Sequence, residues 1–97
     1  MKDSTLYIVV LIHQFPCLHS KLGQKWCPEQ FDPDAFMAMT GKWSTREILC
    51  ALFVVNVWNP GYAKRQKWNF NIFDFFGTAD ADNAVVVSNW TLNPYFP

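Results

Sequence analysis

The chain has 97 residues, of which 51% are hydrophobic and only 16% are charged, and its eight basic and eight acidic residues leave no net charge. This composition excludes an intrinsically disordered chain, and the balanced charge argues against a general nucleic-acid binder, which needs an excess of cations. The length predicts a single domain, residues 1–97, that can bury about 60–65% of its unfolded surface.

Residues 6–12, with the sequence L-Y-I-V-V-L-I, are rich in β-branched side chains and predict a buried strand. A lone strand leaves backbone groups unpaired, so this strand would pair across a homodimer or with residues 85–87. A helix is the alternative for the same residues. Residues 14–30 predict a loop, because Pro16, Gly23 and Pro28 interrupt them.

Asp32 and Pro33 predict the start of a short helix, which Gly41 ends. We expect residues 44–58 to form the central helix, because they contain the longest apolar run of the chain, residues 48–58. Ser44 and Glu47 have the spacing of a capping box, and the run stops at an Asn-Pro-Gly sequence. The run is shorter than the roughly 20 residues that a membrane span needs, so it predicts a buried core helix and no membrane protein.

Residues 59–66 predict a polar turn, and residues 68–77 predict a short amphipathic helix with Phe70, Phe73 and Phe76 on one face. Asp80 or Asp82 would cap a last helix over residues 84–91, with a strand at 85–87 as the alternative. The fold class is therefore mainly α, a small compact helical domain with at most one N-terminal strand. An α+β domain, with that strand paired to a C-terminal one, is the alternative.

The last third of the chain contains the pattern W-N-F-N-I-F-D-F-F-G, followed by D-A-D-N and W-T-L-N-P-Y-F-P. This pattern resembles the C-terminal segments of small proteins encoded by phages and plasmids. The resemblance implies an origin on a mobile element and no particular activity.

Four metal-ligating side chains lie close together in the sequence: His13, Cys17, His19 and Cys27. Four nitrogen and sulfur donors are the number that a structural zinc ion needs. Their spacing departs from the usual C-x-x-C pattern, so ordinary loop residues are the preferred interpretation, with zinc as the alternative. A reactive cysteine–histidine pair is a further alternative, but no residue is identified that would orient it.

A basic turn contains Lys64, Arg65 and Lys67, with Trp68 beside it. Such a turn is usually no more than a solvated surface, but it can also bind an acidic protein surface or a nucleic acid. Helix capping accounts for the acidic residues Asp80 and Asp82 without a catalytic role.

Aromatic residues make up 18% of the chain, which is more than a small core easily covers. We therefore expect exposed rings to form a binding site for another protein or for a second copy. The candidate residues are Trp43, Lys64, Arg65, Lys67, Trp68, Trp90, Tyr95 and Phe96. The expected function is that of a non-enzymatic inhibitor or adaptor that needs no cofactor, and a zinc-stabilised or nucleic-acid-binding accessory protein is the alternative. The absence of a signal-peptide pattern predicts a cytoplasmic location.

Overall fold

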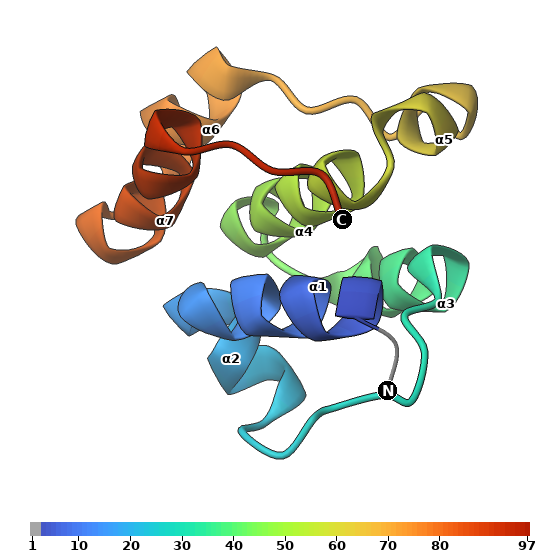
Figure 1. Cartoon of the computed structure of the whole chain (residues 1–97). Helices are drawn as coiled ribbons and strands as arrows, with labels where there is room; N and C mark the ends of the chain where they lie inside the picture. Colours follow the sequence, from blue (N-terminus) through green and yellow to red (C-terminus); the bar gives the residue numbers. More distant parts are fainter. Residues whose placement is uncertain (1–2) are drawn as a thin grey trace.

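The computed structural model describes residues 3–97, so residues 1 and 2 of the predicted single domain lie outside it. Residues 3–97 contain no strand, and the prediction of a mainly α fold is confirmed. The helices are α1 (Asp3–Gln14), α2 (Pro16–Leu22), α3 (Pro33–Ala38), the 3-10 helix η1 (Met39–Lys42), α4 (Thr45–Trp58), α5 (Pro60–Arg65), α6 (Ile72–Thr78) and α7 (Ala81–Leu92) (Figure 1).

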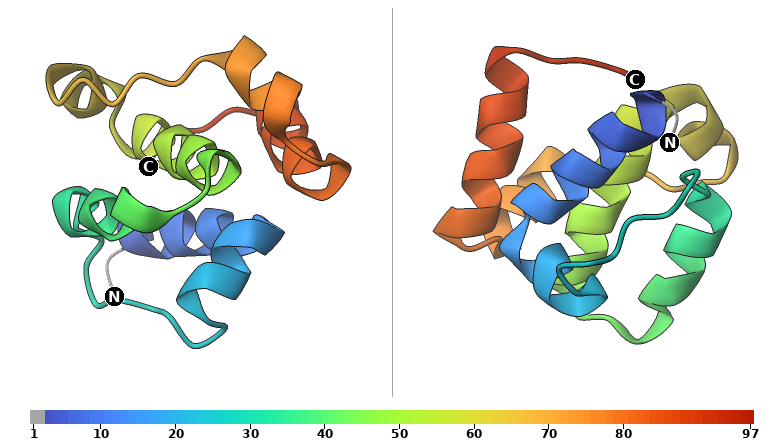
Figure 2. Two further views of the ribbon diagram at one scale, coloured as in Figure 1. Left: turned by 180° about the vertical axis from the view of Figure 1, so that it is seen from behind. Right: turned by 60° about the horizontal axis from the view of Figure 1, so that its bottom comes forward.

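Helix α4 is the centre of the domain, as its apolar sequence predicts. It contacts α1, α2, η1, α5 and α6, and Figure 2 shows α7 on one side of the α1–α4 pair and α3 on the other. The predicted capping box is present: the Ser44 hydroxyl accepts the Glu47 N–H at 3.2 Å, and the Glu47 carboxylate accepts the Ser44 N–H at 2.8 Å. Residues Cys50, Ala51, Phe53, Val54, Val55 and Val57 of this helix are buried.

The predicted N-terminal strand is wrong, because residues 6–12 belong to helix α1. Ile8, Leu11 and Ile12 are fully or almost fully buried and have the i, i+3, i+4 spacing of one helix face. Burial of this face against α4 outweighs the mild preference of β-branched residues for strands. The alternative strand at 85–87 is wrong as well, since these residues lie in α7, and the α+β alternative is excluded with it.

Two short helices, α2 and α5, occupy the segments that were predicted as a loop and a turn. Both begin at a proline, Pro16 and Pro60. Proline suits the first helical position, because an N–H group there would have no hydrogen-bond acceptor within the helix. The side chain of Asn59 caps α5 by accepting the Tyr62 N–H at 3.0 Å. The prolines therefore start helices in these segments and do not exclude them.

The remaining boundaries differ from the prediction in detail. Asp32 caps α3 as expected, but the helix ends at Ala38 and continues as η1 through Gly41. Helix α6 starts only at Ile72, capped by Asn71, so residues 68–71 are extended.

The predicted apolar face of α6 is wrong, because Phe75 is its buried ring. Phe73 and Phe76 are exposed, although both were expected on the buried face. Asp80 caps α7 as predicted, although this helix begins three residues earlier than expected, at Ala81. No helix within residues 3–97 has the length and hydropathy needed to cross a membrane.

Candidate functional site

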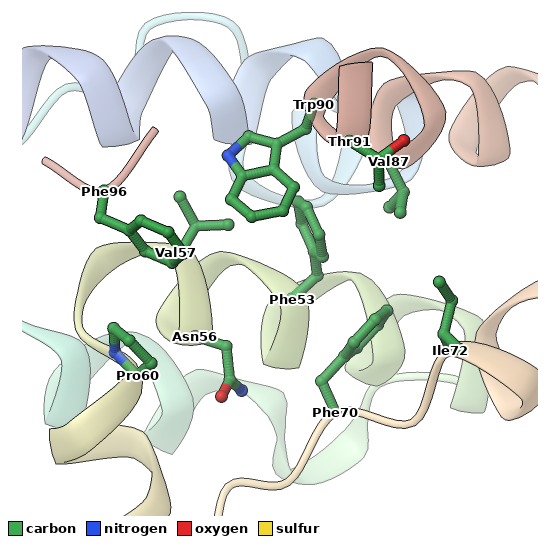
Figure 3. A pocket seen from close by; sticks show the side chains of 10 residues that line it. All are labelled: Phe53, Asn56, Val57, Pro60, Phe70, Ile72, Val87, Trp90, Thr91 and Phe96. Atoms are coloured by element: carbon green, nitrogen blue, oxygen red, sulfur yellow. The ribbon is translucent and has the colours of Figure 1, made fainter. Parts of the chain in front are cut away.

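An apolar groove of about 370 Å³ lies between α4 and α7, and we call it the α4–α7 groove. Its walls come from α4, the start of α5, the segment before α6 and the start of α6, helix α7 and the C-terminal tail, which runs back over α4 (Figures 1 and 3). The residues that line it are Phe53, Asn56, Val57, Pro60, Phe70, Ile72, Val87, Trp90, Thr91 and Phe96. An engineered cavity of about 150 Å³ already holds benzene, so this groove has room for a large aromatic side chain.

Edge-to-face ring contacts fix the walls of the groove. The Trp90 ring meets Phe53 with ring centres 5.4 Å apart and Phe96 also at 5.4 Å, and Phe53 meets Phe70 at 5.3 Å. The Trp90 indole N–H donates to the Tyr95 carbonyl at 3.1 Å, which ties the tail to α7. Such ring pairs add about 0.5–1.5 kcal/mol each beyond the burial of their area, so the groove is preformed.

Asn56 is the polar side chain that α4 contributes to this groove. Its amide Nδ2 donates to the carbonyls of Leu52 at 2.8 Å and Trp68 at 2.9 Å. These two bonds fix the orientation of the amide, because only its nitrogen can donate to carbonyl oxygens. The Asn56 Oδ1 accepts no hydrogen bond from any of residues 3–97, so it is available to a donor that enters from outside.

The elements that line the groove also have the most exposed large apolar side chains of the described chain. Phe73 on α6 is 85% exposed, Leu92 on α7 is 84% exposed, and Phe96 in the tail is 60% exposed. Of these three side chains, Phe96 lines the groove itself, and an exposed apolar group at a recess is typical of surfaces that bind a partner.

The predicted binding residues divide into three places. Trp90 and Phe96 line the groove, and Tyr95 contacts Trp90 from the tail. Trp43 does not line the groove, since its half-buried ring contacts Phe36 of α3.

The basic turn forms a third place, beside the groove. The side chains of Lys64, Arg65 and Lys67 are exposed, with the Arg65 guanidinium 5.8 Å from the centre of the Tyr62 ring. Trp68 is half-buried and contacts the same tyrosine, with ring centres 5.8 Å apart. None of the three cations forms an ion pair with another residue in the range 3–97. The turn therefore presents three cations to solvent next to Pro60, which lines the groove.

The four candidate zinc ligands are not brought together as one set. His13 Nδ1 and His19 Nδ1 are 2.8 Å apart and share a hydrogen bond, while His13 Nε2 is 2.7 Å from the Trp26 carbonyl. Cys17 contacts Cys50, and Cys27 is exposed. Among residues 3–97, no group of three or more His, Cys, Asp or Glu side chains could hold a metal ion.

The acidic residue Asp80 caps helix α7. The Asp80 carboxylate accepts the backbone N–H and the side-chain amide of Asn83, at 3.1 and 2.6 Å. These hydrogen bonds from Asn83 and the nearby Arg46 guanidinium, at 3.6 Å, lower the pKa of Asp80. A carboxyl that stays ionised and bonded in this way caps a helix and is poorly suited to act as a general acid.

Sequence reasoning missed Phe53, Asn56 and Phe70 as parts of the site. Asn56 gave a usable signal, because it is the one polar residue in the apolar run of α4, but Phe53 and Phe70 look like any other core aromatic residues. No family model, no curated protein and no solved structure matches this chain.

Proposed function

We propose that this chain is a small non-enzymatic protein that binds another protein by taking up one of its aromatic side chains in the α4–α7 groove. The observation that carries the proposal is a preformed apolar groove whose lining includes a fixed amide acceptor, Asn56 Oδ1, that receives no hydrogen bond from residues 3–97. A tryptophan or tyrosine of the partner fits this combination, because its ring is apolar and its N–H or O–H needs an acceptor when buried. These two residue types are also common anchors of protein interfaces.

The basic turn supports a partner in which acidic residues flank that aromatic side chain. Lys64 and Arg65 lie on α5, the helix that begins at the groove residue Pro60, and Lys67 follows two residues after this helix ends. Exposed cations near an apolar recess favour acidic partners mainly through faster association and through discrimination against basic ones. The size of the chain suits a cytoplasmic inhibitor or adaptor, and an origin on a phage or another mobile element agrees with the resemblance of its C-terminal third.

A short synthetic peptide can stand in for the partner and test the proposal. We would titrate the ¹⁵N-labelled chain with the amidated, acetylated peptide Glu-Asp-Trp-Glu-Asp and follow the Asn56 side-chain amide and the Trp90 indole N–H by NMR. Binding through the single tryptophan of the peptide predicts a dissociation constant on the order of 1 mM, which corresponds to a binding free energy of about 4 kcal/mol. Peptides with Ala in place of Trp, or with Lys in place of the acidic residues, should bind more weakly.

Two matched variants place the binding in the groove. Thr91→Trp adds a bulky ring at a groove-lining, exposed position of α7 and should abolish the shifts, whereas Ser88→Trp adds the same ring at an exposed position outside the groove. The proposal fails if the peptides cause no shift at Asn56 and Trp90, or if both variants lose binding equally. If the purified chain dimerises and only Thr91→Trp makes it monomeric, the occupant is a second copy and the heterologous partner is refuted.

A further inference from the structure

Two cysteines that take no part in the groove meet where α2, α4 and α7 come together. The Cys17 and Cys50 sulfur atoms are 3.5 Å apart, although 33 residues separate them in the sequence. Cys50 is fully buried on α4, whereas Cys17 on α2 is only half-buried. The Cys17 backbone N–H donates to Asn83 Oδ1 of α7 at 3.3 Å, which helps to hold this end of α2 in place.

We infer that Cys17 and Cys50 form a redox-active pair, which a peroxide converts into a disulfide that joins α2 to α4. A disulfide has a sulfur–sulfur distance of about 2.05 Å, so the two atoms must approach by about 1.5 Å. Rotation of the two side chains and a small shift of α2, a helix of only seven residues, can supply that distance. The inference is independent of the groove and of any partner.

The environment assigns different roles to the two thiols. Contact with Cys50 lowers the pKa of the Cys17 thiol, although partial burial and the carboxylates of Glu47 and Asp80 oppose this effect. Contact with Cys17 and burial raise the pKa of Cys50 well above its usual range. Because the thiolate is the reactive form, Cys17 is the residue that attacks and Cys50 the residue that resolves.

The reaction balances with one hydrogen peroxide. The Cys17 thiolate attacks one peroxide oxygen, the O–O bond breaks, and the hydroxide that leaves takes a proton to become water. Cys17 is then a sulfenic acid, the usual first product of thiol oxidation. The Cys50 sulfur attacks Cys17 Sγ, the S–O bond breaks, and the leaving hydroxide takes the Cys50 thiol proton as a second water. The two thiols lose two electrons, and the peroxide gains them.

Trypsin places the three cysteines in separate peptides, so the product can be identified directly. Cleavage after Lys and Arg gives the peptides 3–21, 26–42 and 47–64, which contain Cys17, Cys27 and Cys50. We would treat the full chain with one equivalent of hydrogen peroxide, alkylate the free thiols and digest without reduction. The expected products are a covalent 3–21/47–64 pair, a loss of about 2 Da from the chain, and one alkylated thiol in place of three.

Two variants control for folding and for the third cysteine. Cys27→Ser should form the same crosslink at the same rate, and Cys50→Ser should stop at a Cys17 sulfenic acid that dimedone traps. The inference is overturned if three thiols remain free while peroxide is consumed, or if the crosslink involves peptide 26–42. A crosslink between two chains overturns it as well. Circular dichroism before oxidation shows whether each variant is folded, and the wild-type result stands without the variants.

Discussion

Replacing Phe75 with alanine should destabilise the domain strongly, whereas the same replacement at Phe73, two residues away, should do almost nothing. The Phe75 side chain is 0% exposed and its ring contacts Phe70 and Phe76, at ring-centre distances of 5.5 and 5.2 Å. Truncation of a buried phenylalanine usually costs about 3–5 kcal/mol through lost burial and the cavity that remains. We expect about 3 kcal/mol here, since α6 is short and lies at the periphery. Phe73 is 85% exposed, so its loss should change stability by less than about 0.5 kcal/mol.

Urea unfolding, followed by circular dichroism, measures both variants under the same conditions. With a slope of about 1.5 kcal/mol/M, a loss of about 3 kcal/mol lowers the midpoint by roughly 2 M, while the Phe73→Ala midpoint should match that of the wild type. The slope itself should stay constant if α6 unfolds together with the rest of the domain. Equal midpoints for the two variants, or a larger loss for Phe73→Ala, would refute the observed orientation of α6.

Three further replacements, one of them with a matched control, test the polar contacts. Asn83→Ala should cost about 2 kcal/mol in urea unfolding, because the buried amide is lost and the Cys17 N–H is left without its partner, whereas the exposed Asp82→Ala should be neutral. Ser44→Ala removes half of the capping box of α4 and should cost about 1 kcal/mol. Hydrogen bonding from the Ser44 backbone lowers the pKa of Glu47, so its ionised form stabilises the fold above the unfolded pKa, and this contribution is lost as pH falls. Wild type should therefore exceed Glu47→Gln in stability at neutral pH, and the difference should begin to shrink at about pH 4.3, the usual pKa of a free glutamate, and vanish only below the lowered pKa of the folded state.

Helix α4 could be predicted from the sequence because several local signals agree there. Its capping box, its apolar length and its Asn-Pro-Gly stop all point to one helix, and no tertiary information is needed. Residues 6–12 carried conflicting signals, since β-branched content favours a strand while Ile8, Leu11 and Ile12 have helical spacing. Only packing against α4 decides between a strand and a helix here, and this packing cannot be predicted from the seven residues alone.

The orientation of α6 shows a different limit. Residues 70–76 contain four phenylalanines, so several helix faces look apolar and the spacing alone does not select one. The side chain of Asn71 fixes the first residue of α6, because its oxygen accepts the N–H groups of Phe73 and Asp74 at 2.9 and 3.0 Å. A start at Ile72 and not at Trp68 leaves Phe70 extended and brings Phe75 to the buried side.

The groove could be predicted only in part, since its walls come from segments that are distant in the sequence. Trp90 and Phe96 were recognisable as candidates because the aromatic residues, 18% of the chain, are more than a small core easily covers. Phe53 and Asn56 became part of the site only through the fold, which lays α7 and the tail across α4 (Figure 3).

The arrangement of polar groups around α4 separates structural from recognition roles. Most polar side chains near the core already have partners: Asn83 bonds Cys17 and Asp80, and Thr5 accepts the Phe31 N–H at 3.1 Å. Satisfied groups of this kind hold helices together and have little capacity left for a ligand. Asn56 differs, because its donors are used within the chain while its acceptor oxygen is not. In the binding that we propose, an unused acceptor among apolar walls would weaken binding of a purely aliphatic side chain and strengthen binding of a ring with a donor, and Asn56 would then give the groove its selectivity.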